Sequence, residues 1–64
     1  MIYFLSINGT LLRRWNEQAN CMHFYGKLDN KWFISHTTPE MCNDRFDEIT
    51  EQQAREQFPE AFKV

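Results

Sequence analysis

The chain has 64 residues, among them six Phe, two Trp and two Tyr, and a formal net charge of −2 at pH 7. This length excludes more than one domain, and a chain this short buries only about 60% of its unfolded surface. Two cysteines are too few for a disulfide framework, and no apolar run approaches the roughly 20 residues of a membrane-spanning helix. We therefore expect a single domain, residues 1–64, with reduced thiols, soluble in the cytoplasm and without membrane contact.

The first predicted element is a hairpin formed by residues 2–7 and 11–15. Asn8-Gly9 between two apolar runs is the strongest short-range hairpin signal, because a two-residue turn needs positive φ at both positions. Such a turn pairs Leu5 with Leu12 and leaves both faces of the hairpin largely apolar. One face would be covered by the domain's own helix and the other by a partner or by a second copy of the chain.

The second predicted hairpin joins residues 21–25 to residues 31–35. A two-residue turn at Asp29-Asn30 fixes its register. The resulting pairs are Tyr25 with Ile34, Lys27 with Trp32 and His23 with His36. Gly26 inside the strand indicates a bulge or a close backbone approach, either of which would allow this register to slip by one residue.

The last part of the chain predicts one short turn, an edge strand and a helix. Thr38-Pro39-Glu40 is a helix-start signature followed by a weakly helical segment, and residues 46–49 can add a short strand. Thr50 and Gln53 form a capping box at the start of the final helix. Its apolar side carries Ile49, Ala54 and Phe58. Pro59 is expected to interrupt or kink the helix, and Ala61-Phe62 to fold back onto the sheet.

These elements predict an α+β fold. It consists of a small antiparallel β-sheet of two hairpins, with four to five strands, and one C-terminal α-helix packed on one face. The residues expected to form most of the core are Phe4, Leu5, Leu12, Phe24, Trp32, Ile34, Ile49, Ala54 and Phe58.

Candidate reaction chemistry is sparse. Cys21, His23, His36 and Cys42 would assemble a zinc site only in the register above, and their spacing matches no standard zinc-finger pattern. We therefore interpret them as ordinary sheet histidines and free thiols, with no metal or cofactor. A Cys–His nucleophilic pair would lack a substrate pocket, and there is no glycine-rich phosphate loop. We expect no enzymatic activity.

One candidate function is binding of single-stranded nucleic acid. Cations lie beside aromatic residues on adjacent predicted strands, so that bases could stack on the rings while the cations contact phosphates. The residues of this set are Arg13, Arg14, Trp15, Lys31 and Trp32. The net acidic charge argues against this function, which we keep as the alternative.

The favoured function is non-enzymatic protein binding. The ring content exceeds what one thin core can hold, and residues 39–64 contain seven Asp and Glu against three Lys and Arg. Exposed rings surrounded by charge are typical of a protein interface. We expect Trp15 and Tyr25 as exposed ring anchors. The expected acidic rim consists of Asp44, Asp47, Glu48, Glu51 and Glu56. A homodimer, through an edge strand or an open sheet face, is a further expected assembly.

Two segments carry a resemblance to a group of proteins. Lys31-Trp32-Phe33-Ile34, followed later by Glu48-Ile49-Thr50-Glu51-Gln52-Gln53-Ala54 and Phe58-Pro59, resembles the layout of short bacteriophage-encoded proteins. In these an aromatic strand precedes an E-I-T-E-x-x-A helix entry and a terminal Phe-Pro. The resemblance implies a phage or prophage origin and action in the host cytoplasm as an inhibitor or modulator of a host or defence protein. It assigns no functional residue.

Overall fold

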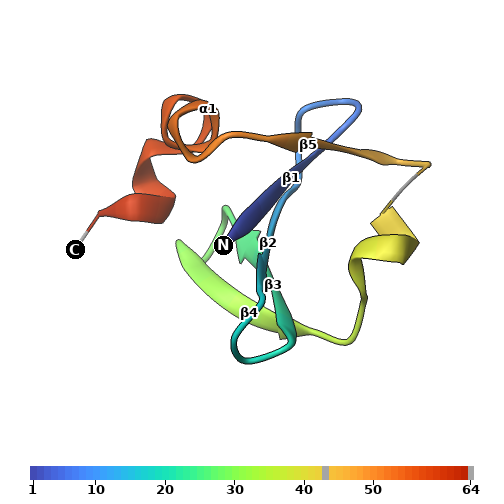
Figure 1. The fold of residues 1–64 in the computed structure, drawn as a ribbon. Helices are drawn as coiled ribbons and strands as arrows, with labels where there is room; N and C mark the ends of the chain where they lie inside the picture. Colours follow the sequence, from blue (N-terminus) through green and yellow to red (C-terminus); the bar gives the residue numbers. More distant parts are fainter. Residues whose placement is uncertain (43, 64) are drawn as a thin grey trace.

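The computed structural model describes residues 1–42 and 44–63 and forms one five-stranded antiparallel sheet with a short helix (Figure 1). The strand order is β4-β3-β2-β1-β5. The strands are β1 (Ile2–Ser6), β2 (Leu12–Asn16), β3 (Cys21–Gly26), β4 (Lys31–Ser35) and β5 (Phe46–Ile49). The helix α1 (Glu51–Gln57) follows β5, and two 3-10 turns, η1 (Pro39–Cys42) and η2 (Pro59–Phe62), complete the chain. The predicted α+β class, including a fifth strand, is confirmed.

The first hairpin has the predicted register but a different loop. Leu5 pairs with Leu12, whereas residues 7–10 form a four-residue loop that is closed by Ser6 N donating to Leu11 O at 2.9 Å. Gly9 has a positive φ of 75° and Asn8 does not, so the predicted two-residue turn is wrong. Ser6 accounts for the wider loop, because its Oγ accepts from Leu11 N at 2.9 Å.

The predicted register of the second hairpin is also wrong. Tyr25 pairs with Trp32, and His23 pairs with Ile34 rather than with His36. The loop again has four residues, 27–30, and Asn30 takes the positive φ of 53° that closes it. Two contacts stabilise this register: the Tyr25 hydroxyl donates to Asn30 Oδ1 at 2.8 Å, and the Tyr25 and Trp32 rings lie 5.5 Å apart.

The helix begins as the sequence predicts. Thr50 Oγ1 accepts from Gln53 N at 3.1 Å, and Thr50 N donates to Gln53 Oε1 at 2.9 Å. The two hydrogen bonds complete the capping box. Pro59 stops the helix, and η2 then returns to the sheet, where Trp32 Nε1 donates to Ala61 O at 3.0 Å.

We expect the replacement Thr50→Ala to lower the free energy of unfolding by about 1 kcal/mol, because it leaves helix N–H groups without a partner. Urea unfolding followed by circular dichroism measures this loss. Thr50→Ser retains the hydroxyl and serves as the control. Equal midpoints for Thr50→Ala and the wild type would mean that the cap does not hold the helix on the sheet.

Two separate apolar clusters cover the two faces of the sheet. We call the side that packs against α1 and η2 the helix face; its buried residues are Tyr3, Leu12, Tyr25, Ala54 and Phe58. We call the other side the open face; its buried cluster is Phe4, Met22 and Cys42. Figure 1 shows α1 and η2 on one side of the sheet and η1 on the other.

The open face is thus covered at one end by the chain itself. Cys42 from η1 is 1% exposed and packs with Met22, where the sequence predicted a partner or a second copy. Of the predicted core, Ile34 is wrong, since it is 62% exposed on β4. Tyr3 and Tyr25 belong to the core and were not predicted, because strand alternation defines two faces without showing which of them the helix covers.

Candidate binding surface on the sheet

The open face presents one cross-strand row of large side chains. The register aligns, from β5 to β4, Glu48, Phe4, Arg13, Phe24 and Phe33. The η1 turn packs on this face through Cys42, which forms a buried cluster with Met22 and Phe4. The remainder of the face is bordered by the loops 7–10 and 27–30 and contains two neighbouring grooves.

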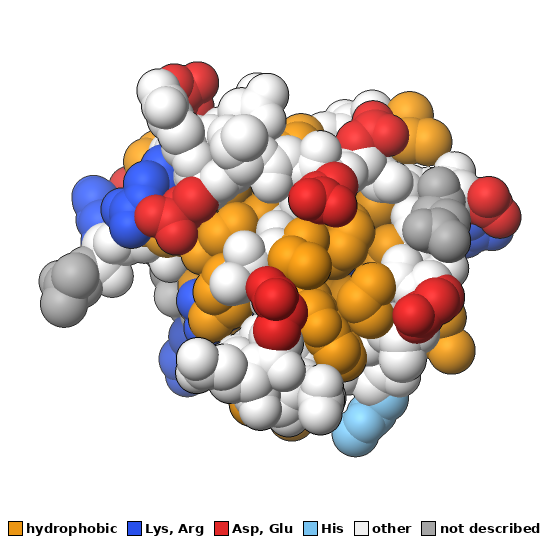
Figure 2. Space-filling view, viewed as in Figure 1, with side chains coloured by type: hydrophobic (Ala, Val, Ile, Leu, Met, Phe, Trp, Pro, Cys, Tyr) orange, Lys and Arg blue, Asp and Glu red, His pale blue; other side chains and the backbone are white. Residues whose placement is uncertain are grey.

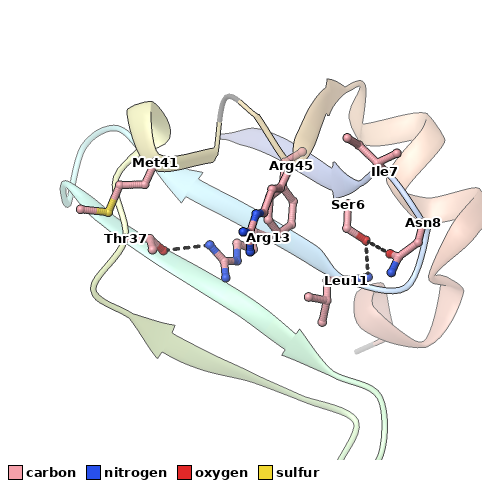
Figure 3. A pocket seen from close by; sticks show the side chains of 9 residues that line it. Ser6, Ile7, Asn8, Leu11, Arg13, Thr37, Met41 and Arg45 are labelled. Atoms are coloured by element: carbon pink, nitrogen blue, oxygen red, sulfur yellow. Dashed lines mark hydrogen bonds between the residues drawn. The ribbon is translucent and has the colours of Figure 1, made fainter.

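The larger groove has a volume of about 680 Å³, and we call it the arginine groove. Figure 3 shows Arg13 and Arg45 in its middle, with Thr37 and Met41 at one end and the first hairpin loop at the other. The residues that line it are Ser6, Ile7, Asn8, Leu11, Arg13, Thr37, Met41, Arg45 and Phe46. Its volume falls in the range of ligand sites, which are mostly apolar with a few polar groups.

Arg13 is held in one orientation from three sides. Its guanidinium carbon lies 4.6 Å from the centre of the Phe46 ring. Its Nη1 donates to Thr37 Oγ1 at 3.3 Å and approaches Cys42 Sγ at 3.9 Å. Its Nε is buried and has no hydrogen-bond partner among the described residues. The cation therefore sits in the groove with part of its donor capacity unused.

Arg45 reaches the same groove from the segment that precedes β5. Its main chain is fixed twice, since Ile7 N donates to Arg45 O at 3.0 Å and Arg45 N donates to Cys42 O at 3.3 Å. Its side chain is exposed. The ion pairs of the described residues involve neither Arg45 nor Arg13. The groove thus holds two arginines without a carboxylate partner within the described chain.

The second groove, of about 420 Å³, adjoins the first at Leu11, which lines both. Phe24 and Phe33 line it, and their rings stack with centroids 5.5 Å apart. Gly26 allows this stack, because a Cβ there would lie 2.7 Å from the Phe33 ring. Leu28 in the adjoining loop is fully exposed and lines the same groove.

The structure divides the predicted nucleic-acid residues between two faces. Arg13, Trp15 and Lys31 belong to the open face by register, whereas the remaining two belong to the helix face. There the Arg14 guanidinium lies 4.1 Å from the centre of the Trp32 ring. The expected continuous surface of cations and rings is therefore not formed.

The two predicted ring anchors also differ from expectation. Tyr25 is 4% exposed and packs in the helix-face cluster, so its prediction as an exposed anchor is wrong. Its ring contacts Trp32 and Phe58 from the two elements that flank it. Trp15 is half-buried against the open-face cluster rather than free at the surface.

The predicted acidic residues do not gather around one ring. Figure 2 shows separate Asp and Glu side chains around apolar side chains on the side of the molecule that carries the N-terminus. Glu51 is engaged within the chain, because it pairs with Arg55 at 3.1 Å. Burial, and then the nearby Glu51 carboxylate, raise the pKa of Tyr3, whose hydroxyl donates to Glu51 Oε1 at 3.5 Å. Glu56 accepts from Gln52 at 3.4 Å. Asp44, Asp47 and Glu48 are exposed.

The four Cys and His residues do not come together. Cys21 Sγ lies 3.9 Å from His23 Nδ1, while Cys42 is buried in the cluster of the opposite face. The shifted hairpin register separates His36 from His23. Within residues 1–42 and 44–63 no group of three potential ligands is close enough to hold a metal ion.

Sequence reasoning missed most of the arginine groove. Only Arg13 was a candidate, whereas Arg45, Ile7, Leu11 and Met41 were not. The available signal was Ile7 and Leu11 on either side of a polar loop, since apolar residues beside a tight turn have little core to enter.

In the described part of the chain no helix is long and apolar enough to cross a membrane. No family model, curated protein or solved structure matches this chain.

Proposed function

We propose that this protein is a non-enzymatic binding module whose open sheet face binds a partner protein stoichiometrically and thereby inhibits or modulates it. The observation that carries this proposal is the concentration of exposed apolar side chains along the two adjoining grooves. Ile7 is 71% exposed, Met41 66% and Leu11 44% at the arginine groove. Leu28 is fully exposed at the second groove. Contiguous exposed apolar surface of this kind is typical of protein–protein interaction sites.

The lining of the larger groove supports binding rather than catalysis. Its residues include two arginines, two hydroxyl groups and an amide, but no histidine, cysteine or carboxylate. The hydroxyls of Ser6 and Thr37 are engaged in hydrogen bonds, with Asn8 and Arg13 respectively. A general base or an activated nucleophile would require a titratable side chain in this place.

In line with the resemblance to short bacteriophage-encoded proteins, we propose a host or defence protein as the partner and the cytoplasm of a bacterial host as the place of action. The aliphatic and thioether side chains at the grooves fit this proposal, because such groups pack against protein side chains and adapt to their shape.

An affinity capture from bacterial lysate tests the proposal. The tagged wild-type protein should recover one host protein at near-equal stoichiometry, with and without nuclease, as read by mass spectrometry. Leu11→Asp should abolish the recovery, because it puts a charge where both grooves meet. Since Leu11 is 44% exposed and belongs to neither buried cluster, this variant should remain folded.

Ile34→Asp is the matched control. Ile34 is 62% exposed but projects from β4 on the helix face, so the same change should leave the capture intact. Equal capture by all three proteins would place the interface elsewhere. Recovery that disappears with nuclease would replace protein binding by nucleic-acid binding.

Binding of single-stranded nucleic acid remains the second candidate, for one specific reason. The stacked Phe24 and Phe33 rings lie on the same face as Arg13 and Lys31, which is a pattern that can hold bases and phosphates. If this function is correct, a fluorescent oligothymidylate should bind with an affinity that falls steeply with added salt. Protein binding through an apolar surface should depend on salt much less.

A further inference from the structure

We propose that the arginine groove binds an acidic linear segment of the partner protein, with a side-chain carboxylate on Arg13 and Arg45 and an adjacent apolar side chain on Leu11. The inference rests on the proposed protein-binding function and names the chemistry of the ligand at that site. It follows from the charge, the orientation and the apolar border of the groove.

The charge of the groove points to an anion. Two arginines line one groove, and neither forms an ion pair within residues 1–42 and 44–63. Glu48 shares the face of Arg13 but is separated from it by the strand that carries Phe4. Like charges brought together in this way favour an incoming negative group.

The orientation of Arg13 favours a carboxylate over a diffuse contact. The Phe46 ring, 4.6 Å from the guanidinium carbon, and Thr37 Oγ1, which accepts from Nη1, restrict the orientation of this guanidinium. A guanidinium held in one plane presents its donors as a fork, which matches the two oxygens of a carboxylate. Arg45, fixed through its main chain to Ile7 and Cys42, supplies the second cation.

The border of the groove favours a peptide as the carrier of this carboxylate. Ile7, Leu11 and Met41 are exposed at its rim. They offer contacts to side chains on either side of an acidic residue in an extended segment. A phosphate backbone has no apolar side chains to place there, which is why we infer an acidic peptide rather than a nucleic acid.

A displayed library of random dodecapeptides, selected on the intact protein, tests the inference. We expect enrichment of peptides with Asp or Glu next to a large apolar residue. For a synthetic peptide of the enriched sequence, Arg45→Gln should weaken binding roughly tenfold and Arg13→Gln roughly ten- to hundredfold, as expected for loss of a charge-assisted hydrogen bond. A peptide in which Asn or Gln replaces the acidic residue should lose a similar ten- to hundredfold of its affinity for the wild-type protein.

Lys31→Gln is the control, because Lys31 is an exposed cation of the open face outside the arginine groove. It should leave peptide affinity unchanged. Arg13 packs on Phe46, so its replacement can loosen the fold; Arg45 is exposed, and Arg45→Gln therefore decides the test.

Three outcomes would overturn the inference. They are enrichment without an acidic preference, an unchanged affinity in Arg45→Gln, and displacement of the peptide by oligothymidylate with the same dependence on Arg45. If the partner protein is still captured and the capture is still lost in Leu11→Asp, only the ligand chemistry is wrong. If that capture also fails, the proposed function is wrong.

Discussion

Replacing Tyr25 with alanine should unfold most of the protein at room temperature. The side chain is 4% exposed, and its ring lies 5.5 Å from that of Trp32 and 6.1 Å from that of Phe58. Removing a large buried ring costs about 3–5 kcal/mol. A core of this size rarely supplies more than about 3–5 kcal/mol in total. Circular dichroism and thermal unfolding should show little native signal in Tyr25→Ala.

Tyr25→Phe measures the contribution of the hydroxyl to stability separately from that of the ring. It deletes only the hydrogen bond to Asn30 Oδ1 at 2.8 Å, and we expect a loss of about 0.5–1.5 kcal/mol. The two variants also test whether Tyr25 is a core residue or an exposed ring anchor. If Tyr25 were an exposed anchor, Tyr25→Ala would unfold at the wild-type temperature and lose only partner binding.

Local chemistry made the elements predictable. The Thr50–Gln53 capping box, the stop at Pro59 and the turn at Pro39 each depend on residues within a few positions of one another, and the structure contains all three. The alternation of side chains was also correct, because a strand has a period of two whatever its partner. The fold class followed from these local features.

Hairpin register was harder to predict, because it depends on how many residues the loop takes. Ser6 Oγ and Asn30 stabilise four-residue loops in place of the expected two-residue turns. In the second hairpin this change moves the partner of Tyr25 from Ile34 to Trp32. The shift separates the two histidines. Tyr25 is buried for another reason, because its face of the sheet is the one that α1 and η2 cover.

The arginine groove could not be derived from neighbouring residues at all. Arg13 lies on β2 and Arg45 precedes β5, and both line one groove because the edge strand β5 pairs with β1, the neighbour of β2. The hydrogen bond from Ile7 N to Arg45 O then places the second arginine at the groove. Pairing between strands far apart in sequence depends on the whole fold. Local sequence signals therefore do not show that the two arginines line the same groove.

The second large effect is expected at Met22, on the opposite side of the sheet from Tyr25. Met22 is fully buried, and its cluster includes Cys42 from the η1 turn. Met22→Ala should lower the free energy of unfolding by about 2–5 kcal/mol, because the deleted atoms leave a cavity between the sheet and this turn. Urea unfolding monitored by tryptophan fluorescence measures the loss.

Met41→Ala provides a control with the same chemical change. Met41 belongs to η1 but is 66% exposed, so its truncation should change the free energy of unfolding by no more than about 0.5 kcal/mol. The two variants therefore compare the free energy of unfolding lost at a methionine buried beneath the turn with that lost at a methionine exposed at the groove. Equal losses would contradict the division of this face into a covered end and an open groove.

The dependence of the unfolding midpoint on protein concentration tests whether the chain alone covers Met22. If Cys42 and η1 close this end of the sheet, the unfolding midpoints of the wild type and Met22→Ala should not depend on protein concentration. A midpoint that rises with concentration would mean that a second copy binds the folded state and contributes to its stability. The open face would then be a homodimer interface, and its grooves would be occupied before any other protein could bind.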